Sequence, residues 1–171
     1  KNTVYALGHQ HNFRSAEEFA MILADHFVTT YPQFVHKARI TIEETVWQRL
    51  GGDSNPHTHA FQKIGPHTGW ARAVADRSGL VSLQGGVRSL TLLKTTNSSF
   101  TNFHRDRFTL LPEAEDRLLA SAIDATWDYC TSFSKRHRDW TGTSSVVLST
   151  LIASFAGDAR RGKPSPSVQT T

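Results

Sequence analysis

The feature that most constrains the fold of this chain is a capped amphipathic helix that is followed at once by strand-like alternation. Ser15 stands three residues before Glu18, the spacing of a capping box, in which the two side chains satisfy backbone N–H groups that a helix leaves unpaired. Largely apolar residues then recur at helical spacing, at Phe19, Ile22, Leu23, His26 and Phe27. This pattern predicts a helix over residues 16–30 that Pro32 ends.

Period-two alternation of apolar and polar residues follows the helix. Over residues 38–43 it is typical of a half-buried strand, which we expect to run on to Trp47. Turn-forming residues at 51–56 predict a hairpin whose second arm covers residues 57–64. The remaining predicted elements are strands at residues 4–7, 69–76, 79–84, 87–95 and 118–129, and a helix at 143–156 that Gly157 caps.

The order of these elements predicts an α+β fold, in which helices lie on one face of an antiparallel sheet. Gly85-Gly86 interrupts the strand pattern, and we interpret this pair as the boundary between a first part, residues 1–86, and a second part, residues 87–171. The opening residues 1–5 are typical of a strand entered halfway, which predicts that the chain is a piece of a longer one.

Composition favours an ordinary globular protein. Of the 171 residues, 38% are hydrophobic and 20% are charged, which excludes disordered and collagen-like classes. No run of about 18 or more apolar residues is present, so no membrane-spanning helix is predicted. Cys130 is the only cysteine and cannot form an internal disulfide, which fits a reducing compartment.

The net charge of +4 would suit an anionic partner. The basic residues are scattered among acidic ones, however, and the only dense cluster is residues 135–138, which we interpret as a solvated loop. We therefore expect neither nucleic acid nor a membrane as a partner. An anionic small molecule fits the sequence better, because it needs only one or two well-placed cations.

Candidate metal and nucleophile sites are weak. His57 and His59 lie two apart on a predicted strand and share a face, but a structural zinc site needs about four ligands and a catalytic one about three. His67 is the only nearby third candidate, so we predict a hydrogen-bonded histidine pair and no metal. No nucleophile motif is present, and Asp124 and Asp128 are predicted to be surface residues.

The stretch from residue 92 to residue 117 carries the strongest chemical signal. It is a long loop between two predicted strands, rich in aromatic and arginine side chains. Such a loop suits a planar anion, since a ring stacks on the ligand face and a guanidinium meets its oxygens in a bidentate fork. The residues alone leave a second reading open, in which Phe100, Phe103 and Phe108 anchor the loop to the core while Arg105 pairs with Asp106.

Motifs in this stretch resemble those of the urate oxidases (uricases). Residues 92–100, LLKTTNSSF, resemble the family's L-K-[ST]-T-x-S-x-F, and residues 103–111 resemble F-x-[RK]-D-x-[YF]-T-T-L, followed by Asp116-Arg117. Further family motifs are matched in the right order at residues 1–5, 124–127 and 166–169. Because the resemblance spans nearly the whole chain, we expect a uricase.

The resemblance implies a tunnelling fold (T-fold) with two tandem modules, both truncated here. It also implies a homotetramer that binds urate in a pocket at a subunit interface. The residues implied to bind the substrate are Phe100 by stacking on the purine, Arg117 and Gln169 by clamping its edge, Val168 through its backbone, and Leu111 and Ser167 by lining the pocket.

The activity implied by the resemblance is oxidation of urate to 5-hydroxyisourate and hydrogen peroxide, with O2 as co-substrate and without metal, flavin or other cofactor. The family's catalytic lysine and threonine precede the stretch matched by Lys1, and its asparagine and histidine follow the stretch matched by Thr171. No catalytic residue is therefore assigned here, and we expect this segment to be inactive alone. The alternative is a non-catalytic T-fold protein that binds a purine or only assembles. The expected location is the cytoplasm, or the peroxisome for a eukaryotic source.

Overall fold

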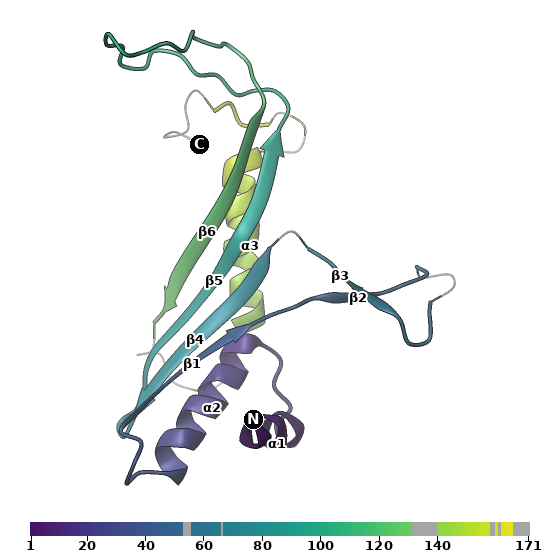
Figure 1. The fold of residues 1–171 in the computed structure, drawn as a ribbon, viewed down its shortest axis with the longest axis vertical. Coiled ribbons are helices and arrows are strands. Elements are labelled where there is room, and N and C mark those ends of the chain that lie inside the picture. The colour runs from purple at the N-terminus through teal and green to yellow at the C-terminus, as the bar shows by residue number, and fades with distance from the viewer. Residues whose placement is uncertain (53–55, 66, 131–139, 158–159, 161, 166–171) are drawn as a thin grey trace. The chain divides into compact units, whose positions relative to one another are not determined.

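The structure of the chain is a computed structural model that describes residues 1–52, 56–65, 67–130, 140–157, 160 and 162–165 (Figure 1). Within these residues the helices and strands follow one another in the order α1 (Asn2–Gln10), α2 (Ala16–Thr30), β1 (Lys37–Glu43), β2 (Trp47–Arg49), β3 (Phe61–Lys63), β4 (Thr68–Asp76), β5 (Gly79–Lys94), β6 (Leu119–Tyr129) and α3 (Trp140–Ala156).

The strands form two antiparallel sheets (Figure 1). The larger sheet has the order β1-β4-β5-β6, and the smaller one consists of β2 and β3. In the larger sheet, Ile40 of β1 lies opposite Ala73 of β4, and Ala73 lies opposite Leu83 of β5. The predicted α+β fold with an antiparallel sheet is confirmed.

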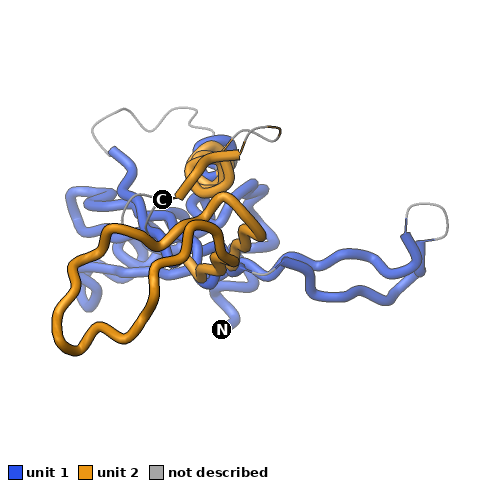
Figure 2. Tube along the Cα trace, turned by 90° about the horizontal axis from the view of Figure 1, so that it is seen from above, with its two compact units in different colours: residues 1–90, 124–144 blue, residues 91–123, 145–171 orange. Residues whose placement is uncertain are grey.

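The chain divides into two compact units (Figure 2). The first contains residues 1–90 and 124–144, and the second contains residues 91–123 and 145–171. Strands β5 and β6 and helix α3 each contribute residues to both units. The assignment of residues 1–86 and 87–171 to two tandem modules stays a prediction.

Small side chains let helix α2 lie close against the sheet in the first unit. The helix packs on β1 and β4. Ala20 and Ala24 of the helix share one buried cluster with alanines of β1 and β4, and the larger side chains of Leu83 and Tyr129 complete this cluster. Alanine on both surfaces leaves little volume between them, so the helix and the sheet can approach to the packing density of an ordinary core.

The predicted helix over residues 16–30 is confirmed, but its buried face differs from the prediction. The fully buried hydrophobic residues of α2 are Ala16, Ala20, Leu23, Ala24 and Val28. Of the larger residues predicted to face inward, only Leu23 is among them. The others are half-buried because alanines occupy much of the face that lies against the sheet, and bulky rings such as Phe27 pack at the edge of the cluster.

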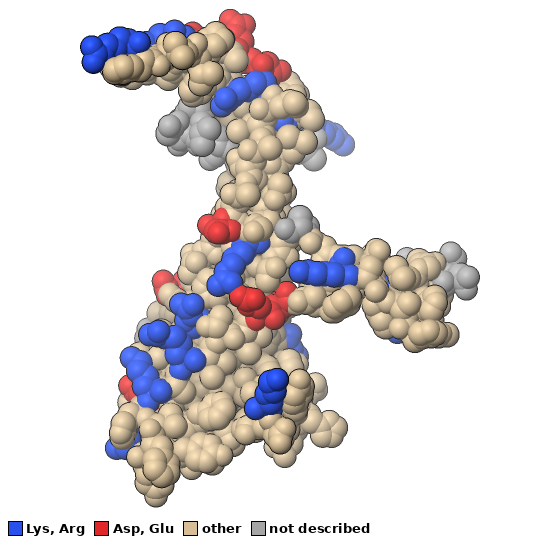
Figure 3. All heavy atoms as spheres, viewed as in Figure 1, with Lys and Arg blue, Asp and Glu red and all other residues tan. Residues whose placement is uncertain are grey.

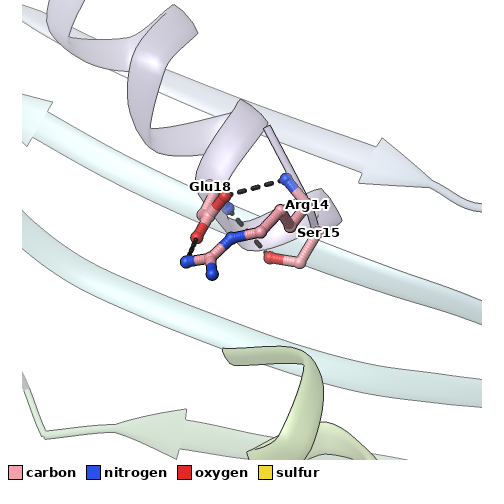
Figure 4. A network of polar contacts seen from close by, with 3 residues as sticks. All are labelled: Arg14, Ser15 and Glu18. Carbon is pink, nitrogen blue, oxygen red and sulfur yellow. Dashed lines mark hydrogen bonds and ion pairs between the residues drawn. The ribbon is translucent and has the colours of Figure 1, made fainter. Parts of the chain in front are cut away.

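The start of α2 is capped much as the sequence predicts (Figure 4). The Ser15 Oγ accepts a hydrogen bond from the Glu18 N–H at 3.2 Å. The Glu18 carboxylate reaches back to the Arg14 N–H at 2.8 Å, one residue before the position that the capping box predicts, and also pairs with the Arg14 guanidinium at 3.0 Å. The helix start is thus fixed by both serine and glutamate, although the second bond differs.

Two strand predictions near the N-terminal end are wrong. Residues 4–7 belong to helix α1, which buries Leu7 and packs Gly8 against the ring of Phe19 on α2. Four alternating residues are too few to distinguish a strand from the exposed side of a short helix.

The strand predicted to run on to Trp47 ends at Glu43, because Trp47 begins β2 and pairs with Lys63 of β3 in the separate hairpin sheet. The predicted hairpin itself is confirmed, although only Phe61–Lys63 of its second arm is strand.

The glycine pair Gly85-Gly86 is not a break between strands, because β5 runs through it without interruption. A Cβ atom added at Gly86 would lie 2.3 Å from the Trp70 ring, and one added at Gly85 would lie 2.5 Å from Trp127 Nε1. Successive residues of a strand point to opposite faces of the sheet. The two glycines therefore make room for one tryptophan on each face of β5.

Replacing Gly86 with alanine tests this interpretation. We expect Gly86→Ala to lower the free energy of unfolding by about 1–3 kcal/mol, the usual cost of overpacking, because the Trp70 ring must move. Gly8→Ala is the matched control, since its Cβ would meet Phe19 at an ordinary 3.5 Å and alanine favours a helix. Urea unfolding of both variants measures the effect, and equal stability of Gly86→Ala and the wild type would contradict it.

A buried hydrogen-bonded network joins α2, β6 and α3 in the first unit. The Tyr129 hydroxyl donates to the Glu17 carboxylate at 2.7 Å, and the Ser144 hydroxyl donates to the same oxygen at 2.8 Å. The Trp140 ring meets the Tyr129 ring edge-on, with centroids 4.9 Å apart. Since Tyr129 contacts both helices, α2 and the start of α3 cover the same face of the sheet, as the sequence predicts.

Burial raises the pKa of Tyr129 from 10.0 to about 12. Between these two values the folded protein holds a proton that the unfolded chain has lost, so the free energy of unfolding falls as the pH rises through this window. This contribution is fully present below pH 10. We expect Tyr129→Phe to remove that part of the pH dependence, and urea unfolding of both proteins at several pH values from 9 to 12 measures it. Parallel curves for the two proteins would contradict the assignment.

Candidate substrate site

The second unit contains a long connection, residues 95–118, between β5 and β6. Its two halves are held together by main-chain hydrogen bonds. The Phe100 N–H donates to the Ala114 carbonyl at 2.7 Å, and the Ala114 N–H donates back to the Phe100 carbonyl at 3.0 Å. The Arg117 N–H donates to the Ser98 carbonyl at 2.7 Å. These bonds bring Phe100 and Arg117 together although they are far apart in sequence.

Phe100 and Arg117 form the centre of the candidate site. The guanidinium carbon of Arg117 lies 4.7 Å from the centroid of the Phe100 ring. The Phe100 ring also stacks on Phe103, with centroids 4.3 Å apart and an interplanar angle of 15°. Both residues of the pair are half-buried. The structure therefore unites the two residues that the sequence predicts to stack on and to clamp a planar ligand.

The guanidinium of Arg117 has hydrogen-bonding capacity to spare. Its Nε is buried and has no hydrogen-bond partner. Within the described part of the chain, no carboxylate lies at ion-pair distance from it. A buried donor without a partner costs free energy, and an acceptor on a ligand would relieve that cost.

Asp116 fixes the backbone next to Arg117 and does not neutralise its side chain. Its carboxylate accepts a hydrogen bond from the Thr96 hydroxyl and another from the Ser98 N–H at 3.2 Å. The hydrogen bond from Thr96 contributes most and the one from Ser98 comes next, and both lower the pKa of Asp116 below its ordinary value. The negative charge of Asp116 is thus used to hold the loop at residues 96–98.

Lys94 attaches a later segment of the chain to the same region. Its Nζ donates to the Lys163 carbonyl at 2.8 Å and to the Ser165 hydroxyl at 2.6 Å. The ammonium lies 5.0 Å from the centroid of the Phe155 ring on α3. Only 8% of Lys94 is exposed, and this burial lowers the pKa of its ammonium.

A shift in the inward–outward alternation of β5 explains why Lys94 is buried. Leu83, Gly85 and Val87 are buried in alternation, but the next buried residues are Leu90 and Lys94, which shifts the alternation by one. Ser89 has a φ of 58°, and its N–H donates to the Asp124 carboxylate of β6 at 2.7 Å. Without this shift the apolar Leu93 would point inward, whereas it is 61% exposed.

Of the other predicted binding residues, only Leu111 lies within the described part of the chain. Leu111 is 65% exposed, and its carbonyl accepts a hydrogen bond from Arg105 Nη2 at 3.1 Å. Ser167, Val168 and Gln169 lie outside the described residues, as does the basic cluster 135–138. Their proposed roles stay predictions.

The second reading of the loop is wrong in two respects. Phe108 is 72% exposed and does not anchor the loop. Asp106 accepts hydrogen bonds from the Phe108 N–H and from the Thr109 hydroxyl, whereas Arg105 lies over the Phe103 ring at 4.9 Å. The arginine therefore supports the aromatic pair, and the aspartate closes the tip of the loop.

The histidine and aspartate pairs have local partners. His57 and His59 lie in the turn of the β2–β3 hairpin and outside its strands, contrary to the prediction, and their rings meet edge-on. His57 Nδ1 accepts from the Ala60 N–H at 3.1 Å, in keeping with the predicted hydrogen-bonded pair. Asp124 and Asp128 are exposed, as predicted, and Asp128 accepts from Gln84 of β5.

The described residues also bear on two other features, a metal site and a membrane-spanning helix. No group of three or more histidine, cysteine, aspartate or glutamate side chains in the described ranges is arranged to hold a metal ion. No described helix is long and apolar enough to cross a membrane. On the face shown in Figure 3, lysine and arginine side chains occur in separate groups, with acidic side chains beside several of them.

Sequence reasoning missed Lys94, Asp116 and Ser165. All three form hydrogen bonds that hold the loop or the segment at 162–165 in place, and no residue pattern predicts such a role. The only available signal was a lysine placed between an apolar strand and a motif rich in serine and threonine.

Known proteins resemble this chain over its whole length. A family model described as Uricase matches residues 1–72 and 83–171. The chain is 39% identical over 176 residues to uricase-2 isozyme 1 from Glycine max and 36% identical over 171 residues to the uricase from Oryctolagus cuniculus; each alignment covers 100% of this chain and 56% of the relative.

Solved structures agree with these relatives. The crystal structure of uricase from Arthrobacter globiformis matches with a TM-score of 0.76 at 32% identity, and the match covers 91% of this chain and 50% of that one. Urate oxidase from Bacillus sp. TB-90 shares the fold with a TM-score of 0.75 at 20% identity, over 99% of this chain and 57% of that one.

The sheet, its helices and these structural likenesses define an α+β protein with the T-fold, as the sequence predicts. The chain belongs to the uricase family. It spans about half the length of the relatives that it matches, 56% of the Glycine max protein and 50% of the Arthrobacter globiformis chain.

Removal of the Asp116 carboxylate tests its role in holding the loop. We expect Asp116→Ala to speed hydrogen exchange at the amides of Ser98 and Arg117, since the carboxylate accepts from the first and stabilises the turn that contains the second. Asp106→Ala is the control, because this exposed aspartate bonds only within residues 106–109. Hydrogen exchange read by mass spectrometry measures both, and equal exchange in the two variants would exclude the role.

Proposed function

We propose that the protein to which this chain belongs is a urate oxidase, and that this chain supplies one side of its substrate pocket. The observation that carries the proposal is the pairing of Phe100 with Arg117, whose buried Nε has no partner, in a member of the uricase family. Relatives named uricase, at 36–39% identity over the whole of this chain, support it.

The chemistry of urate fits these two side chains. Urate is a planar anion with carbonyl oxygens and ring nitrogens along its edge. Phe100 offers a ring for stacking, and its other neighbour Phe103 holds that ring in place. Arg117 offers a planar fork of N–H donors that matches two acceptors on the ligand edge. Stacking also excludes water, which strengthens the polar contacts.

Three residues beyond Ser165 would complete this side of the pocket. Ser165 pairs with Ser98, which precedes Phe100 by two residues, and Ser167 follows Ser165 by the same number. Two extended residues reach about 7 Å at most, so in this proposal Ser167 lies within reach of the Phe100 ring. In this proposal the Gln169 amide donates and accepts along the urate edge, Val168 contributes its backbone, and Ser167 and Leu111 line the pocket.

The proposed reaction balances without a cofactor. Urate, O2 and one water give 5-hydroxyisourate and hydrogen peroxide. Urate loses two electrons, which reduce O2 with two protons to hydrogen peroxide, and water supplies the added hydroxyl group. The contribution of the residues described here is to bind the anion, to orient it and to stabilise its charge.

Assembly of several chains is part of the proposal. The larger sheet ends in β1 and β6, and in the described residues neither outer edge pairs with a further strand. β6 alone is 11 residues long, and an open edge of that length favours pairing with another strand. A homotetramer with the pocket at a subunit interface would satisfy these edges and would bring catalytic groups to the substrate. We expect the segment of residues 1–171 to be inactive alone.

Substitution of Arg117 tests the proposed function. In the complete chain that the gene encodes, we expect Arg117→Ala to lower kcat/KM for urate at least about tenfold, because a hydrogen bond to a charged group contributes roughly 1.5–3 kcal/mol and about 1.4 kcal/mol is a factor of ten. Arg107→Ala is the matched control, since Arg107 also lies over a phenylalanine ring, that of the exposed Phe108. Loss of urate absorbance and release of peroxide measure the activity.

The outcomes separate the site from the function. Equal loss in Arg107→Ala and Arg117→Ala would exclude a specific role for Arg117. A complete wild-type chain that binds urate without oxidising it would overturn the proposed activity and favour the non-catalytic purine-binding alternative.

A further inference from the structure

We infer that Lys94 is a positioning residue that clamps residues 162–165 against residues 97–99 and thereby sets the place of the pocket residues that follow Ser165. The inference rests on the proposed function for what the pocket binds. The clamp itself rests only on the geometry of described residues in the second unit.

The first argument is the cost of burying a cation. Lys94 is 8% exposed, and a buried ammonium loses its hydration. An apolar side chain would occupy the same space without that loss, so the ammonium is not needed to fill the volume. What it adds is two hydrogen bonds, to the Lys163 carbonyl and to the Ser165 hydroxyl.

Among the described residues, the other attachments of this segment include a main-chain bridge and one contact of the Lys163 side chain. Ser165 bridges Ser98 in a parallel sense: the Ser99 N–H donates to the Ser165 carbonyl at 2.9 Å, and the Ser165 N–H donates to the Asn97 carbonyl at 2.9 Å. The two main-chain bonds and a contact from the Lys163 ammonium to the Ser154 carbonyl at 3.1 Å are a weak fixation for a segment that follows Gly157 and contains Gly162, both with positive φ. Lys94 adds a charged donor at the same point.

The two segments are parallel where Ser98 and Ser165 bridge them. In sequence, Phe100 follows Ser98 by the same number of residues as Ser167 follows Ser165. A shift of the Ser165 segment would therefore move the residues proposed to face the purine edge while leaving Phe100 and Arg117 in place. Such a shift weakens binding of the ligand more than it changes the reacting groups, which this chain is not proposed to supply.

The chain offers an unusually close control. Ser98 and Ser165 are the two residues of the bridge, and each is 1% exposed. The Ser165 hydroxyl holds Lys94, whereas the Ser98 hydroxyl is buried without a hydrogen-bond partner. Alanine at either position leaves the main-chain bonds intact, so only the replacement at Ser165 loosens the clamp.

The kinetic experiment compares Lys94→Met, Ser165→Ala and Ser98→Ala in the complete chain that the gene encodes. We expect KM for urate to rise about tenfold in Lys94→Met and about threefold in Ser165→Ala, with kcat within about twofold of the wild type, since the lost bonds are of the charge-assisted kind. Ser98→Ala should keep the wild-type KM. A fall in kcat and in thermal stability without a change in KM would show a merely structural role and overturn the inference.

Hydrogen exchange tests the clamp without relying on catalysis. The amides of Ser99 and Ser165 form the bridge, and we expect both to exchange faster in Lys94→Met and Ser165→Ala than in Ser98→Ala. Unchanged exchange in the first two variants would overturn the clamp even if the enzyme oxidises urate. If the wild-type chain does not oxidise urate, the proposed function fails, and the exchange data still decide whether Lys94 holds the segment.

Discussion

The continuity of strand β5 is the constraint on which the rest of the structure depends. It pairs with β4 and β6, and it ends at Lys94. Continuity requires glycine at positions 85 and 86, because a tryptophan lies against each face of the strand there. It also requires a shift in alternation near Ser89, which Asp124 stabilises through its carboxylate. If β5 broke at the glycine pair, the partners of β4 and the lysine that organises the candidate site would no longer lie on one strand.

The candidate site combines a rigid base with an unsatisfied donor. Main-chain bonds between Phe100 and Ala114 fix the loop, and Asp116 closes its base through Thr96 and Ser98. The negative charge nearest to Arg117 in sequence is therefore occupied elsewhere, which leaves the guanidinium available to a ligand. A loop that bonded Asp116 to Arg117 directly would neutralise the guanidinium and leave it with little to offer an anion.

The sequence predicted features that depend on neighbours along the chain and missed those that depend on distant packing. The helix at 16–30 could be predicted because its serine cap and its periodicity are local features. Phe100 and Arg117 could be predicted as a pair because both lie in one motif-rich stretch. The glycine pair was misread because its reason lies in Trp70 and Trp127, on two other strands. Likewise, the sequence did not predict the role of Lys94, since its partners at residues 163–165 follow a whole strand and helix later.

The groups around Phe100 limit which face of its ring a ligand would stack on in the proposed pocket. Phe103 lies 4.3 Å from the Phe100 centroid and the Arg117 guanidinium 4.7 Å, and two groups this close cannot share one ring face. In the proposed pocket, a planar ligand would therefore take the face that the guanidinium covers and move Arg117 to the ligand edge. That exchange gives up a cation–π contact of about 0.5–1 kcal/mol for stacking and for charged hydrogen bonds of roughly 1.5–3 kcal/mol. Because the Arg105 guanidinium lies over the Phe103 ring, we expect the stacked rings of Phe100 and Phe103 to stay in place while Arg117 moves.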